Sequence, residues 1–391
     1  MRLASRPILL AATLFLLLGV SPAAAQVKIG LITTLSGPGA TLGQDQYDAF
    51  MLAVEQNGGK LGGVPVSVIR KDDQLKPDLG AQLAQELIEK DQVDLVTGVI
   101  FSNVMMAVYP RIVGSETIFI GSNAGPSPIA GAQCSPYFFS TSWTNDSLHE
   151  NGGAVANILG YKNVYLMAPN YQAGRDAISG FKRLFEGTVV DEVYTQINQP
   201  DYSAEISQIQ AARPEAVYVF YPGGMGVNFV KQYRQAGLMG RIPLISTSTI
   251  DGSTLPAIRD AAIGAITAAP WEPALDNPQT KTFVAAFTAK YGRSPSFYAA
   301  QSYDAAQLIA SALEKTNGNV ADKKAFLAAL KQADFQSLRG DFRFDTNQFP
   351  ITDWYMWEVV KNPGDANPSF AFRGKTLSEH RVAYRELCPM E

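Results

Sequence analysis

Cysteine and histidine are scarce in this chain, and their scarcity excludes several classes of protein. Two cysteines and two histidines occur among 391 residues. Two cysteines cannot build a zinc ribbon or a disulfide-dense scaffold. His149 and His380 stand far apart in unrelated surroundings. A histidine-based metal centre or catalytic triad is therefore not expected, and we predict neither a metal nor a cofactor.

The chain also lacks an excess of positive charge and the common catalytic motifs. The net charge is −4, with 32 basic against 36 acidic residues, so a basic surface for nucleic acid is not expected. The motifs G-x-S-x-G, G-x-x-x-x-G-K-[ST], H-E-x-x-H and C-x-x-C do not occur. These absences argue against an enzyme. An amidase or dehydrogenase remains an alternative that turnover of a bound ligand would reveal.

One long apolar run is present, at the N-terminus. Ile8–Val20 carries no charge but is too short to span a bilayer comfortably, which takes about 20 residues. A short basic segment precedes it, and Ala23–Ala25 follows as an A-x-A cleavage signal. We interpret residues 1–25 as a secretory signal peptide rather than an uncleaved anchor. In an oxidising compartment, Cys134 and Cys388 are then expected to form a disulfide.

The remaining chain alternates short apolar runs with amphipathic segments. The apolar runs predict strands at Val27–Thr33, Val64–Arg70, Asp94–Val99, Thr117–Ile120, Asn163–Met167, 188–194, Ala216–Phe220, Pro243–Ser246 and Trp354–Val360. The amphipathic segments predict helices at Gly43–Gln56, Asp78–Glu89, 147–159, 174–185, 202–212, 224–236, 278–291, 297–316 and 321–332. This alternation predicts an α/β fold with parallel sheets. The number of units exceeds one sheet, so we expect two lobes.

A glycine-rich loop follows the first predicted strand. Gly37–Gly43 reads G-x-G-x-x-x-G, one residue longer than the dinucleotide-binding fingerprint. No acidic residue stands where a ribose-binding carboxylate would follow the second strand, and Asp72–Asp73 lie in a turn with lysines. We interpret the loop as lining a cleft, with a plain turn as the alternative.

Four polar, glycine-bearing loops follow strands, two in each half of the chain. They comprise residues 98–103, 121–126, 170–176 and 221–224. Ligands of open α/β sheets bind outside the carboxyl ends of the strands, so the loops predict one shared site. Ser102 either caps the helix that follows it or, with neighbouring amides, receives a carboxylate.

These loops, in this order, resemble the periplasmic branched-chain amino-acid-binding family, the solute receptors of ABC importers. The resemblance is carried by Val27–Pro38, Val96–Ser102, Asn170–Gly180 with its Tyr-x-x-Gly-Arg-Asp, Phe229–Leu238 and Tyr303–Ala305. It implies a type I periplasmic binding protein, whose two Rossmann-like lobes with parallel sheets are joined by three hinge crossovers. Candidate crossovers are Phe138–Asn145, Ala268–Ala274 and Phe342–Ile351.

The resemblance further implies the extent of the lobes and the partners. The N-lobe would comprise residues 26–141 plus 271–351, and the C-lobe residues 142–270 plus 352–391. A ligand would bind in the cleft in the periplasm, and hinge closure would present the closed form to an ABC permease in the inner membrane. The alternative is a sensor that passes its closed form to a membrane signalling partner.

Candidate ligand-binding residues also follow from the resemblance. By position, the family's carboxylate-binding, backbone-contact and aromatic positions fall on Ser102, Asn123, Ala124, Gly125, Tyr171 and Tyr221. Phe101 and Trp271 are available as further aromatic walls. Two positions depart from the amino-acid binders: Gly125 stands near their Thr or Ser, and Thr247–Ile250 stand where an acid pairs the ligand's ammonium.

The second departure bears on the ligand, because a buried ammonium without a carboxylate partner is costly. We therefore predict a small carboxylate with an aromatic body, whose ring hydroxyl would bond Thr247 and Thr249. Relatives in the family that bind aromatic acids fit this expectation. Two alternatives stay open: Asp251 reaches in and restores amino-acid binding, or another apolar or amide ligand binds.

Overall fold

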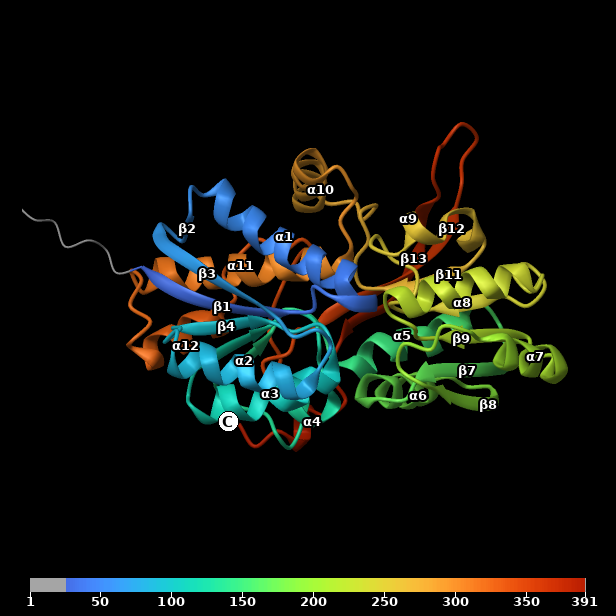
Figure 1. The fold of residues 1–391 in the computed structure, drawn as a ribbon, viewed down its shortest axis with the longest axis horizontal. Helices are drawn as coiled ribbons and strands as arrows, with labels where there is room; N and C mark the ends of the chain where they lie inside the picture. Colours follow the sequence, from blue (N-terminus) through green and yellow to red (C-terminus); the bar gives the residue numbers. More distant parts are fainter. Residues whose placement is uncertain (1–25, 391) are drawn as a thin grey trace, which may run out of the picture.

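The computed structural model of the protein describes residues 26–390. Its strands form two separate sheets that lie side by side along the long axis, each accompanied by helices (Figure 1). The predicted signal peptide, residues 1–25, lies outside the described residues. Within the described part of the chain, no helix combines the length and the apolarity that a membrane crossing needs.

The first lobe is built on a six-stranded sheet with the order β2-β3-β1-β4-β5-β6. Its strands are β1 (Val27–Thr33), β2 (Lys60–Leu61), β3 (Val64–Asp72), β4 (Leu95–Gly98), β5 (Ile118–Gly121) and β6 (Phe138–Ser140). Its helical segments are η1 (Gly37–Gly39), α1 (Ala40–Gln56), α2 (Pro77–Glu89), α3 (Ser102–Gly114), α4 (Ser127–Ala130), α10 (Pro278–Tyr291), α11 (Phe297–Lys315) and α12 (Lys323–Gln332). Strand β1 is buried at all positions except Lys28, as expected for a central strand covered on both faces.

The second lobe is built on a seven-stranded sheet with the order β13-β12-β11-β10-β9-β7-β8. Its strands are β7 (Asn163–Pro169), β8 (Thr188–Thr195), β9 (Ala216–Val219), β10 (Leu244–Ser246), β11 (Ile266–Ala269), β12 (Thr352–Val360) and β13 (Ser369–His380). The associated helices are α5 (Asn145–Ile158), α6 (Gln172–Leu184), α7 (Ser203–Ala212), α8 (Gly224–Gln235) and α9 (Leu255–Ile258), with 3-10 turns η2 (Arg259–Ala262) and η3 (Arg385–Leu387).

The prediction of two α/β lobes is confirmed, with corrections at the sheet edges. Strand β2 runs antiparallel to β3, and β12 runs antiparallel to both β11 and β13, so the sheets are mostly and not wholly parallel. Trp354–Val360 is not the last strand, because β13 follows it as a long, half-exposed edge strand. Short or exposed edge strands bury few apolar side chains, so their periodicity is weak.

Helix α1 begins at Ala40 and not at the predicted Gly43. Gly43 lies in its first turn, where an added Cβ atom would stand 1.9 Å from the Thr34 carbonyl oxygen. Only glycine allows the helix to approach the end of β1 so closely. The last glycine of the G-x-G-x-x-x-G pattern thus serves helix packing.

The chain passes between the lobes three times within the described residues: between β6 and α5, between β11 and α10, and between α12 and β12. These passages overlap the three predicted crossovers. After α10, Arg293 forms ion pairs with Asp45 (2.6 Å) and Asp48 (2.8 Å) of α1. This pairing fastens the segment that leads into α11 to the first lobe.

The predicted disulfide is present. Cys134 and Cys388 are bonded, with their Cα atoms 5.6 Å apart. The bridge holds the C-terminal tail beside α4 of the first lobe (Figure 1).

Candidate ligand-binding site

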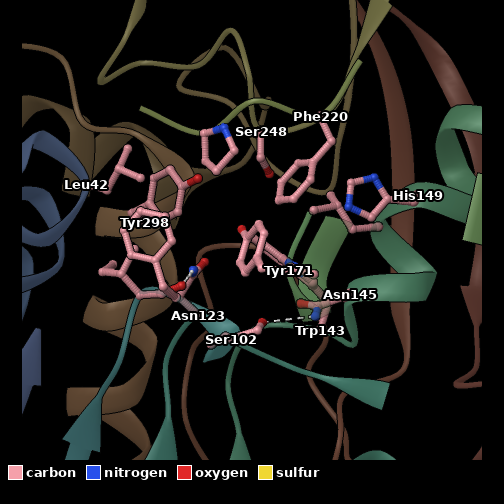
Figure 2. Close-up of a pocket in the computed structure, with 16 residues that line it drawn as sticks. Leu42, Ser102, Asn123, Trp143, Asn145, His149, Tyr171, Phe220, Ser248 and Tyr298 are labelled. Atoms are coloured by element: carbon pink, nitrogen blue, oxygen red, sulfur yellow. Dashed lines mark hydrogen bonds between the residues drawn. The ribbon is translucent and has the colours of Figure 1, made fainter. Parts of the chain in front are cut away.

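A cavity lies where the two lobes meet, with about 370 Å³ of empty space including its open side. From the first lobe it is lined by Leu42, Ile100, Phe101, Ser102, Asn123, Ala124 and Tyr298. From the first crossover and the second lobe it is lined by Trp143, Asn145, Leu148, His149, Tyr171, Ala173, Phe220, Pro222 and Ser248 (Figure 2). None of these sixteen side chains belongs to Asp, Glu, Lys or Arg.

The lobes are in close contact beside this cavity. Gly223 of the second lobe has a φ of +67°, and an added Cβ would lie 2.5 Å from the carbonyl oxygen of Pro38. Pro38 and Leu42 both belong to the glycine-rich segment Gly37–Gly43, and Leu42 lines the cavity. The interpretation of this loop as part of the cleft agrees with that position.

Ser102 is the first residue of α3 and is almost fully buried. Its side chain does not cap the helix. Instead, its Oγ accepts a hydrogen bond from Nδ2 of Asn145 at 3.0 Å (Figure 2). Because the oxygen accepts, the hydroxyl proton remains available to donate to an oxygen in the cavity.

Three helices begin at the cavity wall. Ser102, Asn145 and Ala173 belong to the first turns of α3, α5 and α6. First-turn amides have no acceptor within their own helix and carry partial positive charge. In α5 the amides of Asn145 and Ser147 already donate to the Gly125 carbonyl oxygen (2.7 Å) and to Oγ1 of Thr144 (3.3 Å). With no Lys or Arg in the lining, the N-termini of α3 and α6 are therefore the source of attraction for an anionic group.

The predicted backbone segment 123–125 contributes unevenly. Asn123 and Ala124 line the cavity, but the amide of Ala124 already donates to the Val99 carbonyl oxygen at 3.1 Å. Gly125 does not line it, and a Cβ there would lie 1.9 Å from the Trp143 carbonyl oxygen. A Thr or Ser would not fit at this position.

The amide of Asn145 lies beside this segment. Its Oδ1 accepts from the backbone amide of Gly125 at 3.4 Å, while its Nδ2 bonds Ser102. Asn145 thus supplies a polar side chain beside Gly125.

Aromatic rings form the walls. Phe101 and Tyr171 meet across the lobes, with ring centroids 6.4 Å apart and ring planes inclined by 52°. Tyr171 and Phe220 lie 6.2 Å apart with planes inclined by 18°. Burial raises the pKa of Tyr171, which therefore keeps its phenol proton near neutral pH. Flat apolar walls of this kind suit a planar, apolar ligand body.

Besides Gly125, four predicted residues lie outside the cavity lining. Tyr221 packs on Tyr202 and Phe229 in the core of the second lobe. Oγ1 of Thr249 accepts a hydrogen bond from the backbone amide of Tyr221. Trp271 donates from Nε1 to Thr280 at 2.8 Å in the core near α10. Thr247 lies behind His149, with which it hydrogen-bonds at 2.6 Å.

Their neighbours line the cavity instead. Phe220 takes the place expected of Tyr221, and Ser248 that of Thr247 and Thr249. Successive residues of an extended chain point to opposite sides, so an error of one residue exchanges the two faces. Tyr218 lies two positions before Phe220, so both side chains point to the same side of the chain, and both contact His149.

The first crossover and α5 supply residues that the sequence did not single out: Trp143, Asn145, Leu148 and His149. Asn145 and His149 are four positions apart and so lie on one face of α5. That spacing of polar residues at a helix start, directly after a predicted crossover, was the available signal. Burial lowers the pKa of His149 to about 3, so its imidazole is neutral at physiological pH.

Asp251, the alternative partner for an ammonium group, is fully buried and does not line the cavity. Its Oδ1 accepts from the amide (2.7 Å) and hydroxyl (2.6 Å) of Ser253. Burial raises its pKa to about 6. The neighbouring Glu272 is also fully buried, and burial together with the charge of Asp251 raises its pKa well above the ordinary value.

A model of the periplasmic binding protein family matches residues 26–365. A Brucella melitensis protein named Leu/Ile/Val-binding protein homolog 6 is 30% identical over 345 residues, which cover 86% of this chain and 88% of that protein. The solute-binding protein of an ABC transporter from R. palustris, solved with benzoate, has 30% identity and a TM-score of 0.85, covering 90% of this chain and 98% of that one. A solute-binding protein from Rhodopseudomonas palustris BisB5, solved with 3,4-dihydroxybenzoic acid, has 31% identity and a TM-score of 0.83, with the same two coverages.

Two lobes that enclose a cavity between them define a ligand-binding protein. The chain belongs to the periplasmic binding protein family, because the family model covers most of its length. It is a solute-binding protein of the ABC-transporter type, as the resemblance predicts. Proteins of this family bind solutes without converting them, so the chain is a receptor and not an enzyme.

Proposed function

We propose that this protein is the periplasmic receptor of an ABC importer and that its ligand is a small aromatic carboxylate. The observation that carries the proposal is the lining of the cavity, which combines aromatic walls with the N-termini of α3 and α6 and contains no Asp, Glu, Lys or Arg side chain. Helix N-termini and the Ser102 hydroxyl can receive a carboxylate. The rings of Phe101, Tyr171 and Phe220 can pack on an aromatic body.

The alternative is a branched-chain amino acid, which the name of the Brucella relative suggests. Its α-ammonium would need a buried carboxylate partner in the cavity. Asp251 would have to break its bonds to Ser253 and turn into the site. The ligands of the two R. palustris structures, benzoate and 3,4-dihydroxybenzoic acid, support the aromatic carboxylate for this chain.

Isothermal titration calorimetry with benzoate, 4-hydroxybenzoate and leucine tests the proposal. We expect tight binding of an aromatic acid, weak or no binding of leucine, and retained binding of the aromatic acid in Asp251→Ala. Tight binding of leucine that Asp251→Ala abolishes would replace the aromatic acid by an amino acid. Failure of both aromatic acids to bind would also contradict the proposal.

The cellular role is part of the same proposal. Residues 1–25 are removed on export, the lobes comprise residues 26–141 plus 271–351 and 142–270 plus 352–391, and an inner-membrane permease receives the closed form. The intact mass of exported protein tests the first point, and a product that retains residues 1–25 contradicts it. Co-purification with a membrane signalling protein and not with a permease would favour the sensor.

A further inference from the structure

His149 is the one histidine in the cavity lining. Its Nδ1 contacts two hydroxyl groups that do not themselves line the cavity. Nδ1 is hydrogen-bonded to the phenol of Tyr218 and to Oγ1 of Thr247, the latter at 2.6 Å. The two hydroxyl oxygens also lie 2.7 Å apart, so the three atoms make three close contacts that share the available protons. The three atoms form a closed triangle between α5, β9 and the loop after β10, and all three residues are buried.

Counting protons identifies the tautomer of His149. The two hydroxyls bring two protons, and two hydrogen bonds within the triangle use both of them if Nδ1 is an acceptor. If Nδ1 carried a proton, three protons would share the triangle. No side-chain hydrogen bond leads from these hydroxyls to another acceptor among residues 26–390. A buried hydroxyl proton would then lack an acceptor, which is costly. Nδ1 is therefore the acceptor, and Nε2 carries the proton.

Nε2 of His149 makes no hydrogen bond within the described part of the chain, and the ring borders the cavity beside Phe220 (Figure 2). The His149 and Phe220 rings meet edge to face, with centroids 4.7 Å apart. The cavity thus contains a neutral N–H donor whose orientation is set by Tyr218 and Thr247.

Asn145 and His149 both lie on α5, and their spacing relates the Nε2–H group of His149 to the part of the site that is proposed to bind the carboxylate. Asn145, which holds Ser102, precedes His149 by one helical turn on the same face. One turn separates the two side chains by about 6 Å. Ser102 and His149 line the same cavity, so a ligand whose carboxylate lies at Ser102 can present its opposite ring position to His149.

We infer that His149 determines specificity by donating from Nε2 to an oxygen substituent on the ligand ring, so that hydroxylated benzoates bind more tightly than benzoate. This inference rests on the proposed function, because it assumes a carboxylate at Ser102. It also reassigns the expected role of Thr247. The Thr247 hydroxyl positions His149 from behind and does not itself contact the ligand.

Calorimetric titration of benzoate and 4-hydroxybenzoate into wild type, His149→Phe, His149→Gln and Ser248→Ala tests the inference. Wild type is expected to prefer 4-hydroxybenzoate by about tenfold, the usual effect of one hydrogen bond. His149→Phe is expected to lose that preference, so that it binds the two acids equally, and its circular dichroism spectrum shows whether the variant is folded. His149→Gln retains a donor and is expected to restore part of the preference.

Two outcomes overturn the inference while the proposed function stands: wild type binds both acids equally, or the preference survives in His149→Phe and is lost in Ser248→Ala. Binding of neither acid by wild type overturns both proposals.

A measurement on the wild-type protein covers the case in which His149→Phe does not fold. The chain contains one other histidine, His380, whose Nε2 bonds Glu150. In long-range ¹H–¹⁵N spectra, His149 should show a protonated Nε2, and 4-hydroxybenzoate should shift that nitrogen more than benzoate does. The His380 signals serve as the internal control. A protonated Nδ1, or equal shifts with the two acids, contradicts the inference.

Discussion

The side-chain amide of Asn145 donates one hydrogen bond to the Ser102 hydroxyl at 3.0 Å and another to the Asp176 carboxylate at 2.8 Å. Asp176 lies on α6 of the second lobe, and Ser102 begins α3 of the first. Asn145 stands at the end of the first crossover. One residue of the connection thus links the proposed carboxylate-binding hydroxyl to the opposite lobe.

Replacing Ser102 by Ala is expected to weaken binding of benzoate and of 4-hydroxybenzoate equally. The lost bond joins a hydroxyl to a charged group, so the cost is about 1.5–3 kcal/mol, or roughly 10- to 150-fold in affinity. Calorimetry measures it. Ser115→Ala, at the exposed opposite end of α3, is the matched control and should bind as wild type does. Unchanged affinity in Ser102→Ala would place the carboxylate elsewhere.

Asp176→Ala is expected to weaken closure of the lobes. The Asp176 carboxylate accepts from the Ser127 hydroxyl at 2.9 Å in the first lobe and from Asn145 in the crossover. Contacts present only when the lobes meet favour the closed state. Saturating ligand should reduce the radius of gyration of wild type in small-angle scattering, and less so that of the variant at equal ligand concentration. Asp365→Ala, in an exposed loop, is the control. Identical scattering from Asp176→Ala and wild type would exclude this role.

Loss of the disulfide is expected to destabilise the protein without abolishing binding. The bridge closes a loop of 254 positions, and removing a native disulfide costs about 2–4 kcal/mol. Cys134→Ser with Cys388→Ser should lower the urea midpoint while the affinity for ligand stays near that of wild type, because the bridge lies outside the cavity lining. Thiol titration of unreduced, denatured wild type should find no free thiol, and two free thiols would refute the pairing.

The raised pKa of Asp251 predicts that the free energy of unfolding depends on pH, and it determines the direction of that dependence. The folded pKa is about 6, above the ordinary 3.8. The folded state therefore holds this proton more tightly, and stability from this group falls as pH rises from about 4 to about 6. Asp251→Asn should be more stable than wild type above pH 6, by about 1–3 kcal/mol, and nearly equal to it near pH 4.

Urea unfolding at pH 4.5 and pH 7.5 measures this difference, with the exposed Asp365→Asn as control. Glu272→Gln should act in the same direction, because burial also raises the pKa of Glu272. A stability gain that is the same at both pH values would mean that the ionisation of Asp251 is not its cause.

The chain order of strands and helices, the disulfide and the first-lobe part of the site could be predicted from local features. Ser102 and Asn123 directly follow strands β4 and β5, and the carboxyl ends of parallel strands form the cleft edge of each sheet. Tyr171 follows β7 in the same way. For these residues, the position along the chain already implied the position in space.

Only the tertiary structure decided which side of each loop faces the ligand. Phe220 faces the cavity while Tyr221 packs on Tyr202, although nothing local distinguishes two adjacent aromatics. Ser248 reaches the cavity because its backbone takes a left-handed φ of +50° between two buried threonines. The orientation of an extended segment depends on the core packed behind it, and that core comes from distant helices.

The sequence by itself determined an α/β receptor of two lobes, because hydrophobic periodicity and turn residues act locally. The roles of Asn145 and His149 were decided only when the first crossover and α5 packed against the start of α3, strand β9 and the loop after β10. Those partners lie 43 to 98 positions away along the chain: Ser102 is 43 positions from Asn145, and Thr247 is 98 positions from His149. Hydrogen bonds over such separations have no local signal, because each donor and acceptor is chosen by the packing of whole lobes.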